Sequence, residues 1–338
     1  MAPFMAKVLL VTQTEEGAKD AFFQRGSYNR LKQGAQSPAS RHSLVEDPAE
    51  ADIILFAKFH VAFGHLLRKH PFYKAYRDKC FVFAVDVVAV PIVPGVYASL
   101  EKSWHWRSRT RAGFYLSAME NPYVVFDPAP VGHDFLYSFM GATNTWPTRA
   151  ELGKLQHPRG FFLDTSSESL PILRAGTDEQ RGVFWKRYAD IMRRSQFVLC
   201  PRGLATSSIR LFETMQMGRV PVILSDEWIP PDGPRWDEFS IRIRESDVMN
   251  IPKILEEREK EAAALGLKAR EEWERWFSPD VVCNTVVDWC LEIKRTRRLP
   301  EFLSSSLVYF QIPLRPNILR AYLRHWKKRV VDKFAAKQ

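Results

Sequence analysis

Two arginines stand beside the expected start of a helix, where positive charge is unfavourable. Arg202 lies in the loop before this helix and Arg210 lies in or near its first turn. The helix macrodipole disfavours a cation at this end, so the pair makes physical sense if it binds a phosphate-like anion together with the exposed backbone N–H groups. Glu213 follows Arg210 on the same helical face and could accept hydrogen bonds from sugar hydroxyls. The alternative is an exposed surface pair of Arg210 and Glu213, with Arg202 exposed in its loop.

The elements that position these residues have the pattern of a strand–helix–strand unit. Apolar runs rich in β-branched residues cover 195–200 and 220–224, on either side of a segment of helical length. Thr206, Ser207 and Ser208 are preferred helix N-caps, while a glycine ends the helical segment. Gly203 lies in the loop after the first strand, where open α/β sheets bind ligands.

A longer set of motifs around this unit resembles the exostosin family of glycosyltransferases. The central motif comprises Cys200-Pro-Arg-Gly203, Ser208, Arg210, Glu213, Gly218, Pro221-Val222 and Ser225-Asp226. The similarity continues in Trp236, Phe239-Ser240, Glu245, Asp247-Val248 and Ile251-Pro252, and upstream in Phe139, Gly141 and Arg149. In the N-terminal part, Phe81-Val-Phe83, Asp86, Pro94-Gly95 and Tyr97 resemble bacterial members. The resemblance covers roughly residues 50–290.

The resemblance implies a GT-B fold, in which two Rossmann-like α/β domains face a cleft and the C-terminal helices cross back to the first domain. It also implies inverting transfer of a sugar from a nucleotide diphosphate donor, expected to be UDP-linked, to a hydroxyl of a saccharide or lipid-linked glycan. The residues that it assigns to the nucleotide sugar are Gly141, Arg149, Arg202, Gly203, Ser207, Ser208, Arg210, Glu213 and Asp226. Because the sequence has no Asp-x-Asp motif, no metal or other cofactor is expected, and arginines would stabilise the diphosphate.

Asp86 is the candidate catalytic base. It follows the apolar run 80–85, and a carboxylate at the end of a strand could face a cleft and take the acceptor's proton. The alternative is that Asp86 is only a turn or capping residue. His60, His65 and His70 are five residues apart and so fall on different helical faces, which favours ordinary histidines over metal ligands.

The chain is long enough for two domains and a C-terminal extension. We expect an acceptor domain over 1–134, a donor domain over 135–280, and C-terminal helices with a tail over 281–338. Residues 28–47 are expected to form a loop, 91–97 a rigid loop, and 256–275 one charged helix. The segment 103–111 mixes tryptophans with arginines and could either bind an acceptor or combine packing with solvated charge.

The tail carries almost all the excess charge. Between residues 291 and 338 there are twelve Lys or Arg and three Asp or Glu, whereas the whole chain has a net charge of +10. Apolar residues recur at helical spacing from Leu319 to Phe334 with basic residues between them, which is typical of a helix resting on an anionic membrane surface. Residues 315–338 are therefore a candidate membrane contact. The alternative is a helix that packs its apolar face on the domain.

Parts of the sequence are compatible with two other functional classes. The sequence pI of about 9.4 could suggest a nucleic-acid-binding protein, but the charge is concentrated in one tail, so nucleic acid is not an expected partner. A nucleotide-sugar-binding module without catalysis stays open, because the base is the least certain residue. Scattered cysteines and a short apolar N-terminus predict a cytoplasmic protein, peripheral on the inner face of a membrane if the tail binds lipid.

Overall fold

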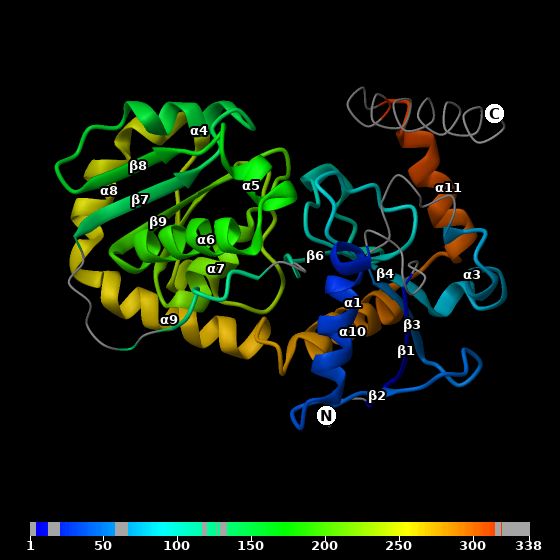
Figure 1. Cartoon of the computed structure of the whole chain (residues 1–338). Helices are drawn as coiled ribbons and strands as arrows, with labels where there is room; N and C mark the ends of the chain where they lie inside the picture. Colours follow the sequence, from blue (N-terminus) through cyan, green and yellow to red (C-terminus); the bar gives the residue numbers. More distant parts are fainter. Residues whose placement is uncertain are drawn as a thin grey trace, which may run out of the picture. The chain divides into compact units, whose positions relative to one another are not determined.

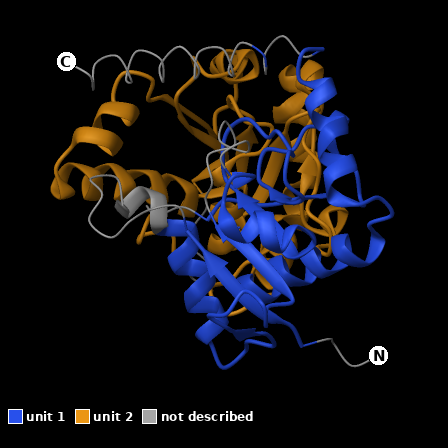
Figure 2. Cartoon of the chain, turned by 90° about the vertical axis from the view of Figure 1, so that its right-hand side faces the viewer, with its two compact units in different colours: residues 1–118, 282–338 blue, residues 119–281 orange. Residues whose placement is uncertain are grey.

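The computed structural model describes residues 5–12, 21–57, 67–116, 120–126, 128, 134–314 and 319, which divide into two compact units. Unit 1 comprises residues 1–118 and 282–338, and unit 2 comprises residues 119–281 (Figures 1 and 2). Each unit contains its own parallel β-sheet with helices packed against it. No helix in the described part of the chain has the length and apolar character needed to cross a membrane.

Unit 1 is built on a six-stranded parallel sheet in the order β2-β1-β3-β4-β5-β6. Its strands are β1 (Lys7–Val11), β2 (Ser43–Leu44), β3 (Ile53–Ala57), β4 (Cys80–Ala84), β5 (Gly95–Tyr97) and β6 (Thr110–Ala112). Its helices are α1 (Ala21–Gln36), α3 (Pro71–Ala75), α10 (Val282–Thr296) and α11 (Glu301–Gln311). All residues of β3 and β4 are buried, as expected for parallel strands that are covered on both faces.

Unit 2 has a five-stranded parallel sheet in the order β11-β10-β9-β7-β8. Its strands are β7 (Phe135–Gly141), β8 (Gly160–Asp164), β9 (Ser195–Pro201), β10 (Val220–Leu224) and β11 (Ile241–Arg242). Its helices are α4 (Pro147–Glu151), α5 (Ser169–Ala175), α6 (Asp178–Arg193), α7 (Ile209–Met217), α8 (Ile251–Arg258) and α9 (Ala262–Trp276). The strand–helix–strand unit predicted around Arg210 is therefore β9-α7-β10.

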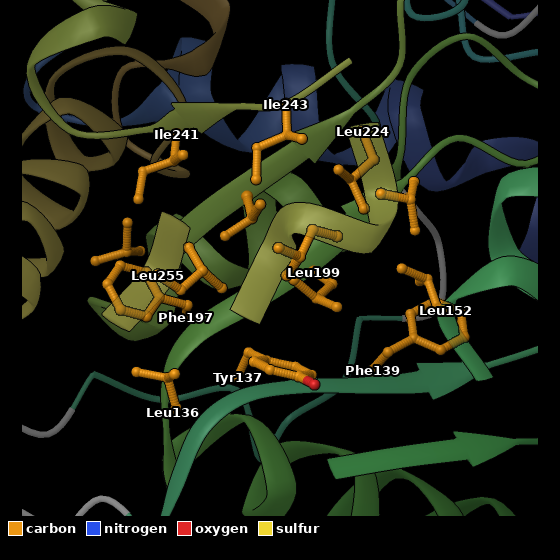
Figure 3. Close-up of a cluster of buried hydrophobic side chains, with 14 of the residues drawn as sticks. Leu136, Tyr137, Phe139, Leu152, Phe197, Leu199, Leu224, Ile241, Ile243 and Leu255 are labelled. Carbon is orange, nitrogen blue, oxygen red and sulfur yellow. The ribbon is translucent and has the colours of Figure 1, made fainter. Parts of the chain in front are cut away.

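The core of unit 2 fixes the central strands of this sheet. Alternate residues of β7 and β9, including Tyr137, Phe139, Phe197 and Leu199, point into one cluster that continues to Leu255 of α8 (Figure 3). The intervening residues of these strands point to the other face of the sheet, where Met140 packs in a second cluster with residues of α6. Packing on both faces holds the ends of β7 and β9, and therefore the loops that follow them, in place.

The predicted α/β class is confirmed. The chain has two parallel-sheet domains, and α10 and α11 belong to the first of them, as the GT-B pattern requires. Residues 120–126 belong to unit 2, upstream of the expected boundary at 135, because the Asn121 side chain donates to the carbonyl of Trp185 and the Val124 carbonyl accepts from Gln216. A cleft between the domains stays a prediction.

Three local predictions are wrong. The expected loop 28–47 begins with the second half of α1, where burial of Leu31 and packing against α10 outweigh the polar composition. The expected loop 91–97 ends in β5, which pairs with both β4 and β6. The single charged helix expected over 256–275 is divided between α8 and α9 by the short 3₁₀ turn Glu259–Glu261.

Candidate functional site

The loops after β7 and β9 meet at one edge of the unit 2 sheet, because these two parallel strands are neighbours. Arg149 of α4 joins the two loops. Its Nε donates to the Arg202 carbonyl at 2.8 Å, its Nη1 to the Ala142 carbonyl at 3.0 Å, and its Nη2 to the Pro201 carbonyl at 3.2 Å. Burial, and secondarily the charge of Arg210, lowers the pKa of Arg149 to about 10. Arg149 thus contributes positive charge, while most of its donors serve the backbone of these loops.

Arg210 is the most deeply placed cation of the site. Its side chain is 6% exposed, and its guanidinium carbon lies 4.6 Å from the centre of the Phe139 ring and 5.6 Å from that of Tyr188. One terminal nitrogen, Nη2, donates to the Met140 carbonyl. The other, Nη1, is buried and has no hydrogen-bond partner within the described residues. A buried charged donor without an acceptor is costly, so this atom marks a position for an anion.

Gly141 provides the space for this guanidinium. A Cβ built at position 141 would lie 2.6 Å from Nη2 of Arg210 and 3.2 Å from Cζ of Phe139. Gly203 has a similar role beside the second loop, because a Cβ there would lie 3.2 Å from Nη2 of Arg149. Both glycines of the predicted site are therefore explained by the arginines that they accommodate.

Glu213 lies on α7 one turn after Arg210 and is half-buried. Its Oε2 accepts a hydrogen bond from the Tyr188 hydroxyl at 2.8 Å. Burial raises the pKa of Glu213, and the opposing effects of the Tyr188 hydrogen bond and the Arg210 charge do not cancel this increase. Since Arg210 and Arg202 are both buried, the alternative of an exposed Arg210–Glu213 pair is excluded.

Arg202 lies over an aromatic ring. Its guanidinium carbon is 3.7 Å from the centre of the Trp146 ring. The indole Nε1–H of Trp146 donates to Glu245 Oε2 at 2.6 Å, and the same oxygen accepts from the Thr148 hydroxyl at 2.8 Å. Burial alone would raise the pKa of Glu245, but these two hydrogen bonds, one from a backbone N–H and the nearby Arg202 charge lower it instead. An ionised Glu245 therefore supports the ring on which Arg202 lies.

Asp226 belongs to the same arrangement through its backbone. Its N–H donates to Glu245 Oε1 at 3.0 Å, while its own Oδ1 accepts from the backbone N–H of Glu245 at 3.2 Å. This reciprocal pair joins the loop after β10 to the residues after β11. Asp226 is exposed, in contrast to the buried arginines.

The start of α7 faces the same edge of the sheet. Ser208 is the N-cap residue, as predicted, although its side chain makes no capping hydrogen bond. The Ser207 hydroxyl is buried, and no group in the described ranges accepts from it or donates to it. Together with the first N–H groups of the helix, Ser207 supplies hydrogen-bond donors close to Arg210 along the chain.

Asp86 lies in unit 1, two residues beyond the end of β4, and is half-buried. Its charge contributes to raising the pKa of Tyr115, after the larger effect of burial. Two of the three arginines of the 103–111 segment, Arg109 and Arg111, are almost completely buried and so cannot belong to an acceptor surface, whereas Arg107 is exposed. Among the described residues, no three His, Cys, Asp or Glu side chains are grouped so that they could hold a metal ion.

Three residues around the site were not predicted as part of it: Trp146, Tyr188 and Glu245. Glu245 belongs to a motif that resembles the exostosins, so the sequence could have indicated that it lies at the site. No sequence pattern indicates its hydrogen bond to Trp146. Tyr188 lies on the face of α6 that packs towards the sheet. From the sequence alone, a tyrosine at this position is interpreted as an ordinary core residue. Its contact with Arg210 becomes visible only in the fold.

This parallel sheet, with an anion position at the carboxyl ends of its central strands, is typical of nucleotide-binding α/β proteins. Residues 130–258 match the Exostosin GT47 domain. This match confirms, for this part of the chain, the resemblance to the exostosin family that was stated from the motifs.

The similar curated proteins match this chain over short stretches of 70 to 130 residues. An exostosin-1 homologue of Caenorhabditis elegans is 39% identical over 70 residues, which is 20% of this chain and 18% of that protein. Exostosin-1 of Drosophila melanogaster is 32% identical over 130 residues, 37% of this chain and 17% of that protein. A probable glucuronosyltransferase of Oryza sativa, Os01g0926700, is 40% identical over 118 residues, 29% of this chain and 27% of that protein. The chain thus spans less than a third of these relatives.

Solved structures of glycosyltransferases are also similar to this chain at low identity. Anabaena Alr3699/HepE in complex with UDP and glucose is 10% identical, covering 87% of this chain and 99% of that one, with a TM-score of 0.42. A glycosyltransferase from Rickettsia africae ESF-5 is 9% identical, covering 86% of this chain and 98% of that one, with a TM-score of 0.40. At these TM-scores the likeness identifies no ligand and no residue role.

Proposed function

We propose that this protein is an inverting glycosyltransferase that uses a nucleotide diphosphate sugar, with UDP as the expected nucleotide. The observation that carries the proposal is the buried guanidinium of Arg210, whose Nη1 has no acceptor within the described part of the chain. It lies at the end of β7 and the start of α7, in the segment that matches the exostosin domain.

In the proposed complex, the diphosphate accepts hydrogen bonds from Arg210, from the Ser207 hydroxyl and from the N–H groups at the start of α7. Arg202 and Arg149 add positive charge, which stabilises the negative charge that develops on the diphosphate as the sugar bond breaks. Glu213, fixed by Tyr188, accepts from the ribose hydroxyls. Asp226 and the backbone at Gly203 border this site.

The reaction that we propose is a single displacement. A base removes the proton from an acceptor hydroxyl, and its oxygen attacks the anomeric carbon as the nucleoside diphosphate departs. Asp86 remains our candidate for the base. The acceptor would be a saccharide or lipid-linked glycan. We propose that the arginines, rather than a metal ion, neutralise the leaving group, so that activity survives treatment with a chelator.

The direct test is a thermal-shift and calorimetric panel of UDP, GDP, dTDP and CMP with the wild type and Arg210→Gln. We expect one nucleotide to stabilise the wild type and to bind the variant about ten- to a hundredfold more weakly, because a hydrogen bond to a charged group contributes roughly 1.5–3 kcal/mol. Equal affinity of both proteins would refute the phosphate site.

A second measurement separates the enzyme from the non-catalytic alternative. Release of the nucleoside diphosphate from the matching nucleotide sugar, with a panel of saccharide acceptors, should be detectable for the wild type and lost in Asp86→Asn. Binding of the nucleotide without turnover on any acceptor would support the non-catalytic binding module instead.

A further inference from the structure

Helix α11 of unit 1, labelled in Figure 1, has an unusual distribution of polar and apolar side chains. Its buried side carries Glu301, Ser305, Val308 and, just past its end, Ile312. Its opposite side carries Leu303, Leu307, Phe310 and, past the end, Leu314, which are 45%, 49%, 76% and 79% exposed. Both sets follow the four-three-four spacing of a helical face. With the adjacent Phe302, 49% exposed, the second set is here named the α11 apolar face.

The orientation of α11 is fixed by a buried ion pair. Arg109 donates to Glu301 from both terminal nitrogens, Nη1 to Oε2 at 2.8 Å and Nη2 to Oε1 at 3.0 Å. The Tyr73 hydroxyl donates to the same carboxylate at 3.1 Å. Rotating α11 to bury its leucines would remove Glu301 from these partners and leave Arg109 buried and unpaired, which is strongly destabilising. The apolar face is therefore directed outward by the fold itself.

The exposed charged residues near this face in the sequence are basic. Residues 293–314 contain the exposed Lys294, Arg295 and Arg298, the largely buried Arg297, which pairs with Asp78, and a single acid, the buried Glu301. The sequence after position 314, almost all of it outside the described residues, adds eight Lys or Arg and one Asp. Exposed leucine and phenylalanine flanked by basic residues is the combination that binds anionic membrane interfaces.

We infer that the α11 apolar face inserts into the interfacial layer of an anionic membrane, with the flanking basic residues held at the lipid headgroups. This assigns the insertion to residues 302–314, whereas the sequence pattern pointed only to 315–338. A second copy of the chain fits the face less well, because the basic residues of two copies would be brought together. The inference is independent of the nucleotide site in unit 2.

The first experiment measures sedimentation of the full chain with vesicles of phosphatidylcholine containing about 30% phosphatidylserine, the anionic lipid of the cytoplasmic leaflet. The test variant is Leu307→Gln/Phe310→Gln/Leu314→Gln, which changes no charge. Its partition coefficient should fall at least about thirtyfold, since each side chain removed from the interface should cost about three- to tenfold. Leu170→Gln/Val183→Gln/Leu267→Gln is the matched control, because these side chains are 52–67% exposed on helices of unit 2.

The second experiment locates the insertion directly. All four cysteines of the wild type, Cys80, Cys200, Cys283 and Cys290, are buried, so Phe310→Cys can be labelled selectively with the environment-sensitive fluorophore NBD. Its emission should increase several-fold and shift to the blue when these vesicles are added, whereas NBD on Val183→Cys should not respond.

Three outcomes would overturn the inference. One is vesicle binding that the triple variant retains, which would leave attachment to the tail alone. Another is NBD emission at position 310 that is already blue-shifted without vesicles, which would show that protein covers the face. The third is a dimer by light scattering that the triple variant abolishes while vesicle binding persists.

Discussion

Replacing Gly141 by alanine tests whether the position of the Arg210 guanidinium controls nucleotide binding. The new Cβ would lie 2.6 Å from Nη2 of Arg210, whereas ordinary van der Waals contact begins at 3.4 Å. The guanidinium must therefore move by about 0.8 Å. It is held by the Met140 carbonyl and between the rings of Phe139 and Tyr188, so it cannot move without disturbing these contacts.

A displacement of this size should cost about tenfold in nucleotide affinity and up to about a hundredfold in turnover, because reacting groups tolerate roughly 1 Å of misplacement poorly. The free energy of unfolding should fall by about 1–3 kcal/mol, as for other overpacked sites. Isothermal titration with the nucleotide identified in the panel and urea denaturation measure the two effects separately.

The control is Gly182→Ala in α6, whose Cβ would meet only the Tyr123 hydroxyl, at 3.7 Å. It should leave affinity unchanged and stabilise the protein by about 0.4–1 kcal/mol. Combining Gly141→Ala with Arg210→Gln gives the decisive comparison. If Gly141→Ala acts through Arg210, it should have little further effect on affinity in the Arg210→Gln protein. Wild-type affinity of Gly141→Ala, or full additivity of the two changes, would refute the reasoning.

Three further predictions concern carboxylates. Glu245→Gln should weaken nucleotide binding about tenfold, measured by titration, because the ring beneath Arg202 loses its ionised acceptor; an unchanged Kd would contradict this. Because the pKa of Glu213 is raised in the fold, its ionisation destabilises the folded state as the pH rises above 4.5. In urea denaturation, the free energy of unfolding of Glu213→Gln should therefore increase relative to that of the wild type with increasing pH. Arg159 is the main cause that lowers the pKa of Glu259 to about 2. The ionised Glu259 carboxylate therefore stabilises the folded state above pH 4.5, and this stabilisation is lost as the pH falls towards 2. Glu259→Gln should cost up to about 1 kcal/mol at pH 7 and less at pH 2, where the folded-state carboxylate is already partly protonated.

Arg210 was predicted as a site residue from two signals, a cation at the start of a helix and a motif that resembles the exostosin family. Its burial between Phe139 and Tyr188 could not be predicted, because these rings come from β7 and α6. Arg149 shows the same limit. Its donors bind backbone carbonyls, which every residue has, so no sequence pattern distinguishes this arrangement from binding of a phosphate.

The second half of helix α1 was missed because its stabilising partner is distant in the sequence. Its residues are largely polar, and local composition favours a loop over 28–47. In the fold α1 packs on α10, and just beyond it the backbone N–H of Arg41 donates to Asn284 of α10 at 2.8 Å. Contacts between segments more than 240 residues apart outweigh weak local propensity.

Helix α11 illustrates a case in which hydrophobic periodicity alone selects the wrong face. Periodicity would place Leu303, Leu307 and Phe310 against the core and Glu301 in water. The structure has the reverse arrangement, because Arg109 is itself almost completely buried and needs the Glu301 carboxylate. An unpaired buried arginine would cost about 3–5 kcal/mol, and turning the helix over would also expose the apolar side chains that its other side now buries. Together these two costs are comparable with the gain from burying three large apolar side chains at about 1.5–3 kcal/mol each. The ion pair therefore helps to turn the leucines outward, and a surface that binds lipid would recover the apolar burial that the fold gives up.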